Sequence, residues 1–141
     1  MKTRVCAVDL GKVRVGVAVS DELGSMAHPR PALDGTNRKA LLASLVSLAE
    51  EEEIGRFVVG LPIEMGGGLG AAADRAQRFA VALANASGRE VELMDERLTT
   101  MEASRRLSEG GKARKAQRAH IDSASAAVLL QAWLDTRSAS S

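Results

Sequence analysis

Apolar residues follow a strand-like pattern in the first part of this chain and take on helical spacing further along it. The first part predicts β-strands. Residues 4–10 hold an apolar run, and residues 13–20 alternate valine with charged or small residues. Gly11 lies in the short link between these segments, which predicts a β-hairpin. Residues 25–33 are expected to form a third strand at a sheet edge, because the two prolines in it cannot donate ladder hydrogen bonds.

From residue 41 the apolar positions take on helical spacing, interrupted by short strand-like runs. The spacing predicts helices around residues 41–49 and 72–83. The runs at residues 57–59 and 91–94 predict two further strands, the first closed by a Gly-Leu-Pro sequence at residues 60–62. Helices and strands therefore alternate through the middle of the chain.

The last third of the chain is expected to be helical. Thr99, with Glu102 three residues later, forms a capping box that predicts a helix start, and the glycine pair at residues 110–111 predicts its end. Residues 124–134 are apolar nearly all round, which is typical of a buried helix. The final residues, 138–141, are expected to be a flexible tail.

This order of elements predicts an α/β fold. Three consecutive strands followed by alternating helices and strands indicate a five-stranded mixed sheet, with an antiparallel hairpin edge plus parallel strands, flanked by helices. A chain of 141 residues suits one domain, which we place at residues 1–137. In such sheets, sites lie beyond the carboxyl ends of the parallel strands.

Composition narrows the kinds of nucleic-acid contact that the chain can make. The net charge is only +1, so overall charge does not indicate a nucleic-acid partner, but six Arg or Lys lie between residues 105 and 120 against a single acid. There is no tyrosine, two Phe and one Trp, which argues against a platform that stacks bases. Any nucleic acid would therefore be held through its phosphates.

The cysteine and histidine content and the hydropathy of the chain argue against a zinc protein and against a membrane protein. Cys6 is the only cysteine, and its place in an apolar strand indicates packing in a reducing compartment. His28 and His120 have no matching cysteine set, so a zinc site is not expected. Since no apolar stretch approaches the ~20 residues of a membrane span and the N-terminal residues lack the apolar h-region of a signal peptide, we expect a soluble, cytoplasmic protein without a membrane partner.

Three acidic residues at the ends of apolar elements are the candidate catalytic residues. They are Asp9 after the first strand, Glu96 after the fifth strand and Asp122 before the last helix. Burying such groups is costly unless a cation or donor meets them, which points to a site for hard cations and to phosphate chemistry. Asp9 could instead bond into its turn, and Asp122 could be a helix N-cap. Against the N-cap role, helical spacing places Asp122 on a mostly apolar face of the last helix, which predicts that it is buried. Glu96 could form an ion pair, and Asp95 is a rival for its role.

Basic residues near these acids are candidate phosphate ligands. Arg14 and Arg97 could neutralise the acids, contact phosphate or form plain surface ion pairs. The segment before Asp122 could guide a phosphate backbone or be an ordinary solvated surface; its candidate residues are Lys112, Arg114, Lys115 and Arg118. The glycine-rich stretch at residues 66–70 lacks the ending of a P-loop and the spacing of a dinucleotide fingerprint, and is interpreted as a loop near substrate.

Four stretches in order resemble the YqgF (RuvX) family of bacterial RNase H-like nucleases, also described as Holliday junction resolvases. They are Val-Asp-Leu-Gly at residues 8–11 through Arg-Val-Gly at 14–16, Val-Val-Gly-Leu-Pro at 58–62, Asp-Glu-Arg-Leu-Thr-Thr at 95–100, and Ile-Asp-Ser-Ala-Ser-Ala-Ala at 121–127. The resemblance runs from about residue 4 to residue 134. Stretch 66–70 is more glycine-rich than is usual in the family.

The resemblance implies an RNase H-like fold and a metal-dependent nuclease that matures the 5′ end of pre-16S rRNA. The family's acidic triad carries over onto Asp9, Glu96 and Asp122. Carboxylates without His or Cys suit Mg²⁺ or Mn²⁺. By analogy with RNase H-like enzymes, Asp9 would bridge two ions roughly 4 Å apart, with Glu96 on one and Asp122 on the other.

Three other interpretations stay open at this point. The Asp-Leu-Gly sequence also resembles the opening of actin-like ATPases and sugar kinases, but those need a second domain for which 141 residues leave no room. A junction resolvase acting on branched DNA would work as a two-fold homodimer rather than a monomer. A non-catalytic RNA-binding factor of ribosome assembly would use the acids structurally. Precursor rRNA is the expected partner, with branched or single-stranded DNA as the alternatives.

Overall fold

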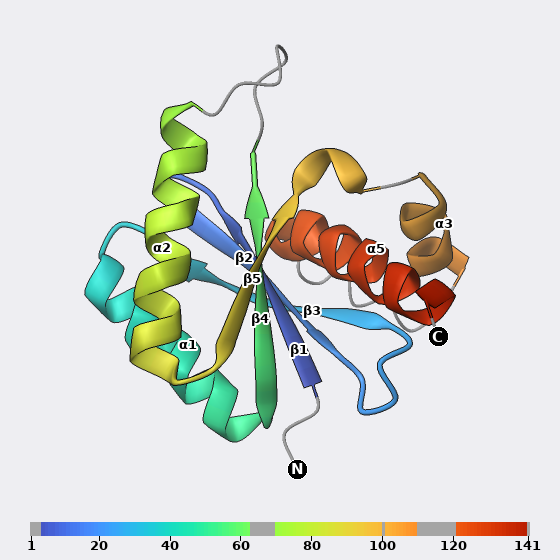
Figure 1. The fold of residues 1–141 in the computed structure, drawn as a ribbon, viewed down its shortest axis with the longest axis horizontal. Coiled ribbons are helices and arrows are strands. Elements are labelled where there is room, and N and C mark those ends of the chain that lie inside the picture. The colour runs from blue at the N-terminus through green and yellow to red at the C-terminus, as the bar shows by residue number, and fades with distance from the viewer. Residues whose placement is uncertain (1–3, 63–69, 100, 110–120, 141) are drawn as a thin grey trace.

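The computed structural model describes residues 4–62, 70–99, 101–109 and 121–140 (Figure 1). The strands are β1 (Arg4–Leu10), β2 (Arg14–Ser20), β3 (Ala27–Asp34), β4 (Ile54–Leu61) and β5 (Glu90–Asp95). The α-helices are α1 (Arg38–Glu51), α2 (Ala71–Ser87), α3 (Met101–Glu109) and α5 (Ala124–Ser140). Two short 3₁₀ turns are η1 (Glu96–Leu98) and η2 (Ile121–Ser123).

The strands form one mixed sheet in the order β3-β2-β1-β4-β5. β1 pairs antiparallel with β2, and β2 with β3, whereas β1 pairs parallel with β4, and β4 with β5. The predicted hairpin, the proline-bearing edge strand and the mixed five-stranded sheet are all confirmed. The parallel part brings the carboxyl ends of β1, β4 and β5 to the same edge.

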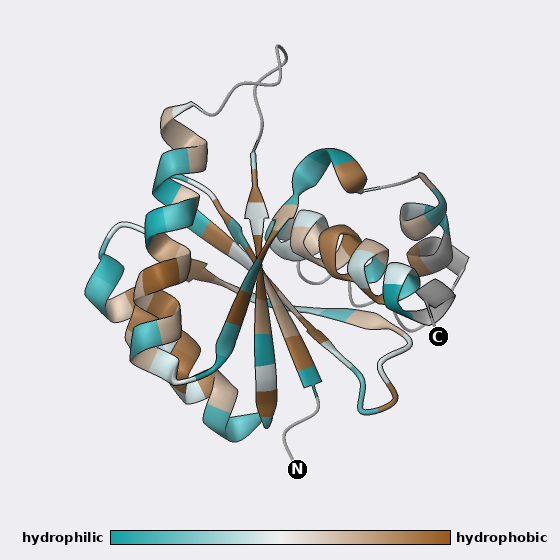
Figure 2. Cartoon of the chain, viewed as in Figure 1, coloured by the Kyte–Doolittle hydropathy of each residue, from teal (hydrophilic) through white to brown (hydrophobic). Residues whose placement is uncertain are grey.

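Helices cover both faces of the sheet, with α1 and α2 on one side and α3 and α5 on the other (Figure 1). Alternation along β1 divides the core, because Ala7 packs with the α5 side and Val8 with the α1 and α2 side. Figure 2 shows hydrophobic residues concentrated in the central strands, with hydrophilic residues on the outer surfaces of the helices. Asp9, two residues after Ala7, therefore faces the α5 side of the sheet.

A close approach of η2 to β2 fixes where α5 begins. The buried Ser123 hydroxyl accepts a hydrogen bond from the Val17 amide at 3.0 Å and donates one to the Arg30 carbonyl at 2.6 Å. At Gly16 an added Cβ would lie 2.9 Å from the Asp122 carbonyl oxygen, so only glycine admits this approach. Because Gly16 pairs with Asp9 across the hairpin, Asp122 is brought to the end of β1.

Several element bounds differ from the sequence prediction. β4 starts at Ile54 and continues through Leu61, so the Gly-Leu pair belongs to the strand. α3 starts at Met101, and the Thr99 hydroxyl donates to the Glu96 carbonyl at 2.8 Å, so Thr99 serves the preceding turn and the predicted capping box is wrong. α5 extends to Ser140, into the segment predicted as a flexible tail. The domain limits at residues 1–137 stay a prediction.

Cys6 is buried in β1, and this burial raises the pKa of its thiol well above the usual range, consistent with a packing role. His28 lies in β3, while His120 lies outside the described residues. Over the parts of the chain that the structure describes, none of the helices has the length and apolar character needed to span a membrane.

Candidate active site

Asp9 and Glu96 meet at the carboxyl edge of the sheet. Asp9 is the penultimate residue of β1, and Glu96 follows β5 as the first residue of η1. Both side chains are half-buried, and their carboxyl groups are joined by a hydrogen bond. β4 lies between β1 and β5, and its residue Gly60 is next to the Glu96 side chain. A Cβ added at Gly60 would lie 2.7 Å from the Glu96 Oε1 atom. The missing side chain of Gly60 therefore makes the space that the Glu96 carboxyl group occupies.

The Glu96 carboxyl group has a raised pKa beside Asp9. Burial first, and then the charge of Asp9 and its hydrogen bond, raise the pKa of Glu96 from 4.5 to about 7. Asp95 adds a smaller repulsion. The Glu96 carboxyl group therefore binds its proton more tightly than a free glutamate does, and a divalent cation bound here would displace that proton.

The turn after β5 gives Asp95 and Glu96 different partners. Asp95 accepts a hydrogen bond from the Arg97 amide at 2.8 Å, which caps η1, and its carboxylate binds the Arg97 guanidinium at 2.8 Å. These Arg97 contacts hold the pKa of Asp95 below its usual range. Asp95 is therefore a structural cap, and Arg97 is paired with it rather than with Asp9 or Glu96.

Asp122 is exposed, and the prediction that it shares the buried face of the last helix is wrong. The 3₁₀ turn η2 directs Ser123 inward and leaves 45% of the Asp122 side chain accessible to solvent. Its carboxylate binds Arg14 Nη1 at 2.6 Å. Arg14 thus forms an ion pair with one of the predicted acids, which fits both the neutralising role and the plain ion-pair role considered for it.

The three acids lie at one end of the sheet, but only two of them converge. Within the described ranges, no group of three or more acidic, histidine or cysteine side chains is close enough to hold a metal ion. Lys112, Arg114, Lys115 and Arg118 lie outside the described residues, as does most of the glycine-rich stretch. The oxygen donors of Asp9 and Glu96 suit a hard cation, whereas the Asp122 carboxylate is bound to Arg14.

Sequence reasoning missed the two glycines that shape this site. Gly60 makes room for Glu96, and Gly16 admits the backbone of Asp122. A signal was available, because a glycine inside a valine-rich strand often marks a close approach of another group. What that group is depends on tertiary packing, which strand periodicity does not specify.

Glu96→Gln is expected to stabilise the metal-free protein at pH 8 but not at pH 4.5. A folded-state pKa raised from 4.5 to about 7 means that the folded protein binds the proton more tightly, so stability falls as pH rises through this interval. The shift corresponds to about 3 kcal/mol at most, and solvent screening at a half-buried site reduces it to about 1 kcal/mol.

Thermal unfolding with a chelator present would test this, with a gain of about 3 °C in Tm expected at pH 8. Asp95→Asn is the matched control, because the lowered pKa of Asp95 predicts no gain at pH 8. An equal gain from Glu96→Gln at both pH values would contradict the role of the Glu96 proton.

Comparison with known proteins gives consistent matches over nearly the whole chain. The family model described as "RuvX: Holliday junction resolvase" matches residues 3–136. A protein of Anaeromyxobacter sp. (strain Fw109-5), named "Putative pre-16S rRNA nuclease", is 45% identical over 136 residues, covering 96% of this chain and 99% of its own. A protein of the same name from Anaeromyxobacter dehalogenans (strain 2CP-1 / ATCC BAA-258) is 42% identical over 134 residues, covering 95% and 98%.

Among solved structures, RuvC of Thermus thermophilus superposes with a TM-score of 0.69 at 13% identity, covering 96% of each chain. At this identity the likeness concerns the fold alone. It confirms the predicted RNase H-like architecture.

Proposed function

Because the chain belongs to the RuvX family, we propose that it is a nuclease that hydrolyses phosphodiester bonds, acting in 5′-end maturation of pre-16S rRNA. The observation that carries the proposal is the hydrogen-bonded carboxyl pair of Asp9 and Glu96 at the carboxyl edge of the sheet. The names of the relatives favour precursor rRNA over other substrates. A protein with this role would work in the cytoplasm.

We further propose that the activity depends on Mg²⁺ or Mn²⁺ held by Asp9, Glu96 and Asp122. Two features support it: the raised pKa of Glu96 beside Asp9, and a donor set made only of oxygens. A bound divalent ion would supply a water of lowered pKa and would offset charge on the phosphate. Glu96 would release its proton on binding the ion.

The cations near the acids would orient the substrate. Arg14 is exposed and holds Asp122 through one guanidinium nitrogen, so it can exchange this carboxylate for a phosphate oxygen when Asp122 turns toward Asp9. Arg97 lies at the same edge, exposed beside Asp95. Lys112, Arg114, Lys115 and Arg118 are proposed to guide the phosphate backbone toward the acids.

A second candidate function is cleavage of four-way DNA junctions, which the description of the matching family favours. Symmetric cutting of two strands would need a homodimer, whereas rRNA processing is compatible with a monomer. Light scattering of the purified protein, with and without a junction, separates these two states.

The test of the proposal is cleavage of three substrates by the purified protein with Mg²⁺, with Mn²⁺, and with a chelator. The substrates are single-stranded RNA spanning the 5′ end of 16S rRNA, single-stranded DNA and a four-way junction. Metal-dependent cutting of the RNA supports rRNA processing, and preferred cutting of the junction by a dimer supports the alternative. Binding of RNA without cleavage under any of these metals would instead indicate an assembly factor.

A further inference from the structure

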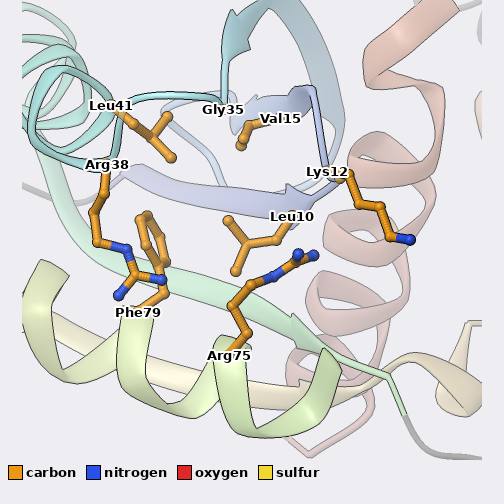
Figure 3. A pocket seen from close by; sticks show the side chains of 9 residues that line it. Leu10, Lys12, Val15, Gly35, Arg38, Leu41, Arg75 and Phe79 are labelled. Carbon is orange, nitrogen blue, oxygen red and sulfur yellow. The ribbon is translucent and has the colours of Figure 1, made fainter. Parts of the chain in front are cut away.

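A small pocket lies on the face of the sheet opposite to the Asp9 side chain, where the β1–β2 hairpin meets α1 and α2 (Figure 3). Its volume is about 60 Å³, enough for a few water molecules or one phosphate group. Apolar side chains of Leu10, Leu41 and Phe79 form its floor. Three cations line it: Lys12 from the hairpin, Arg38 from α1 and Arg75 from α2.

These cations come from three separate elements. The Arg75 guanidinium extends toward Leu10, and the Arg38 guanidinium lies 5.7 Å from the centre of the Phe79 ring. Lys12 lines the pocket at the hairpin, and its side chain extends away from the two arginines (Figure 3). Stacking on Phe79 leaves the N–H groups at the edge of the Arg38 guanidinium free to donate. Among the described residues, no acidic side chain lines the pocket.

The two arginines of this pocket differ from most others in the described structure, which bind carboxylates. The arginines paired with an aspartate or glutamate are Arg4, Arg14, Arg30, Arg56, Arg78, Arg89, Arg97 and Arg137. Arg38 and Arg75 form no ion pair with any described residue. Unpaired guanidinium groups at one concavity constitute a site for an anion.

A larger hollow at the opposite end of the sheet provides the contrast. It has a volume of about 400 Å³ and is lined by Arg4, Arg56 and Arg137. Each of these is already bound to a glutamate, so their charges are neutralised within the protein. Of these two hollows, the small pocket is the one whose positive charge the described residues do not neutralise.

The small pocket and the acid pair flank the same end of β1. Leu10, in the pocket floor, directly follows Asp9, and alternation along the strand turns these two side chains to opposite faces. A nucleic-acid strand that passes over the hairpin end could therefore reach both places with different phosphates. The geometry suits a contact at a phosphate other than the one that is cleaved.

We propose that Lys12, Arg38 and Arg75 form a phosphate subsite that holds one non-scissile phosphate of the substrate strand, either an internal diester or a 5′-terminal phosphate. The inference rests on the proposed function in that the ligand is a nucleic acid. The subsite sets the position of the strand relative to Asp9 and Glu96 and itself carries out no chemistry.

The test is fluorescence anisotropy with a 3′-labelled single-stranded RNA of twelve nucleotides, carrying a 5′-phosphate or a 5′-hydroxyl, in the presence of a chelator to prevent cleavage. The variants are Arg75→Gln and Arg38→Gln. The matched controls remove one charge from the same helices outside the pocket: Arg78→Gln in α2 and Lys39→Gln in α1. Thermal unfolding checks that each variant is folded.

Each pocket variant is expected to weaken RNA binding roughly tenfold, since a charge-assisted hydrogen bond is lost. It should also reduce the slope of log K against log salt concentration by about 0.7, the loss of one phosphate contact. The controls should stay within about twofold of the wild type. Because Arg38 also packs on Phe79, Arg75→Gln is the decisive variant should Arg38→Gln unfold.

If the wild type binds only the RNA with a 5′-phosphate, the subsite holds a terminal phosphate. If it binds both RNAs equally, the subsite holds an internal phosphate. Either result supports the subsite when Arg75→Gln weakens RNA binding. Arg75→Gln that binds as tightly as Arg78→Gln overturns the subsite, even if the wild type cleaves RNA normally. Wild type that does not bind RNA also overturns it. Conversely, Arg75-dependent binding without any metal-dependent cleavage overturns the nuclease proposal but leaves the subsite standing.

Discussion

Asp9→Asn is expected to reduce metal-dependent cleavage at least about a thousandfold while leaving the fold intact, since removal of a group central to the chemistry costs this much in other hydrolases. Asparagine keeps the size of the side chain but loses the charge that a divalent cation would need. In the metal-free protein the variant also removes the repulsion that contributes to the raised pKa of Glu96. We therefore expect no loss of stability at neutral pH.

The measurement is single-turnover cleavage of the preferred substrate with Mn²⁺, together with thermal unfolding. Asp95→Asn is the matched control, because Asp95 is a neighbouring carboxylate that caps η1 and binds Arg97. It should retain cleavage within about tenfold and lose some stability through the weakened cap. Equal rates for the wild type and Asp9→Asn, in preparations shown free of other nucleases, would remove Asp9 from the chemistry.

The strands and their pairing are well predicted from the sequence where local signals are strong. The apolar run before Asp9, the alternation in β2 and the link at Gly11 define a hairpin, and the prolines assign β3 to an edge. The limits of β4 and α3 are less predictable, because Gly60 and Thr99 carry turn and cap signals that tertiary contacts override. Thr99 bonds backward to Glu96 instead of forward into α3.

The sequence proposes the members of the candidate site, but it does not predict how they are arranged. Strand alternation could not separate Asp95 from Glu96, because the 3₁₀ turn after β5 ends the alternation where the choice has to be made. For Asp122, helical periodicity indicated a buried face, whereas η2 exposes its carboxylate to Arg14. In both places a turn of three residues determines the direction of the side chain.

The basic pocket shows the same limit at longer range. Lys12, Arg38 and Arg75 belong to a hairpin and two helices, and they are far apart in the sequence. The cluster of cations that is obvious in the sequence lies at residues 105–118, largely outside the described residues. A phosphate site assembled from separate elements becomes visible only when the missing carboxylate partners can be checked in three dimensions.

Gly60→Ala is expected to lower cleavage about a hundredfold in a protein that still folds. The new Cβ would lie 2.7 Å from Oε1 and 3.2 Å from Cγ of Glu96, so the carboxyl group has to move away from Asp9. A displacement of about 1 Å in a reacting constellation costs about two orders of magnitude in rate. The stability cost should be about 1 kcal/mol, at the low end for overpacking, because the atoms that must move belong to the end of a side chain.

Gly16→Ala is the matched control for this argument. Its Cβ would meet the Asp122 carbonyl oxygen at 2.9 Å and the Ser123 Cα at 3.3 Å, which are backbone atoms held by the Ser123 hydrogen bonds. We expect Gly16→Ala to cost more in stability, about 2–3 kcal/mol, and Gly60→Ala to cost more in rate than its small loss of stability explains.

A further readout links Gly60→Ala to Glu96 without requiring cleavage. If the new methyl group separates Glu96 from Asp9, the hydrogen bond that helps to raise the Glu96 pKa is lost, and the fall in stability between pH 4.5 and about 7 becomes shallower. A Gly60→Ala protein that cleaves normally and keeps the pH dependence of the wild type would show that β4 does not set the position of Glu96. If the cleavage rate of Gly60→Ala falls while the pH dependence of its stability stays that of the wild type, the cause of the lower rate lies outside the pair of Asp9 and Glu96.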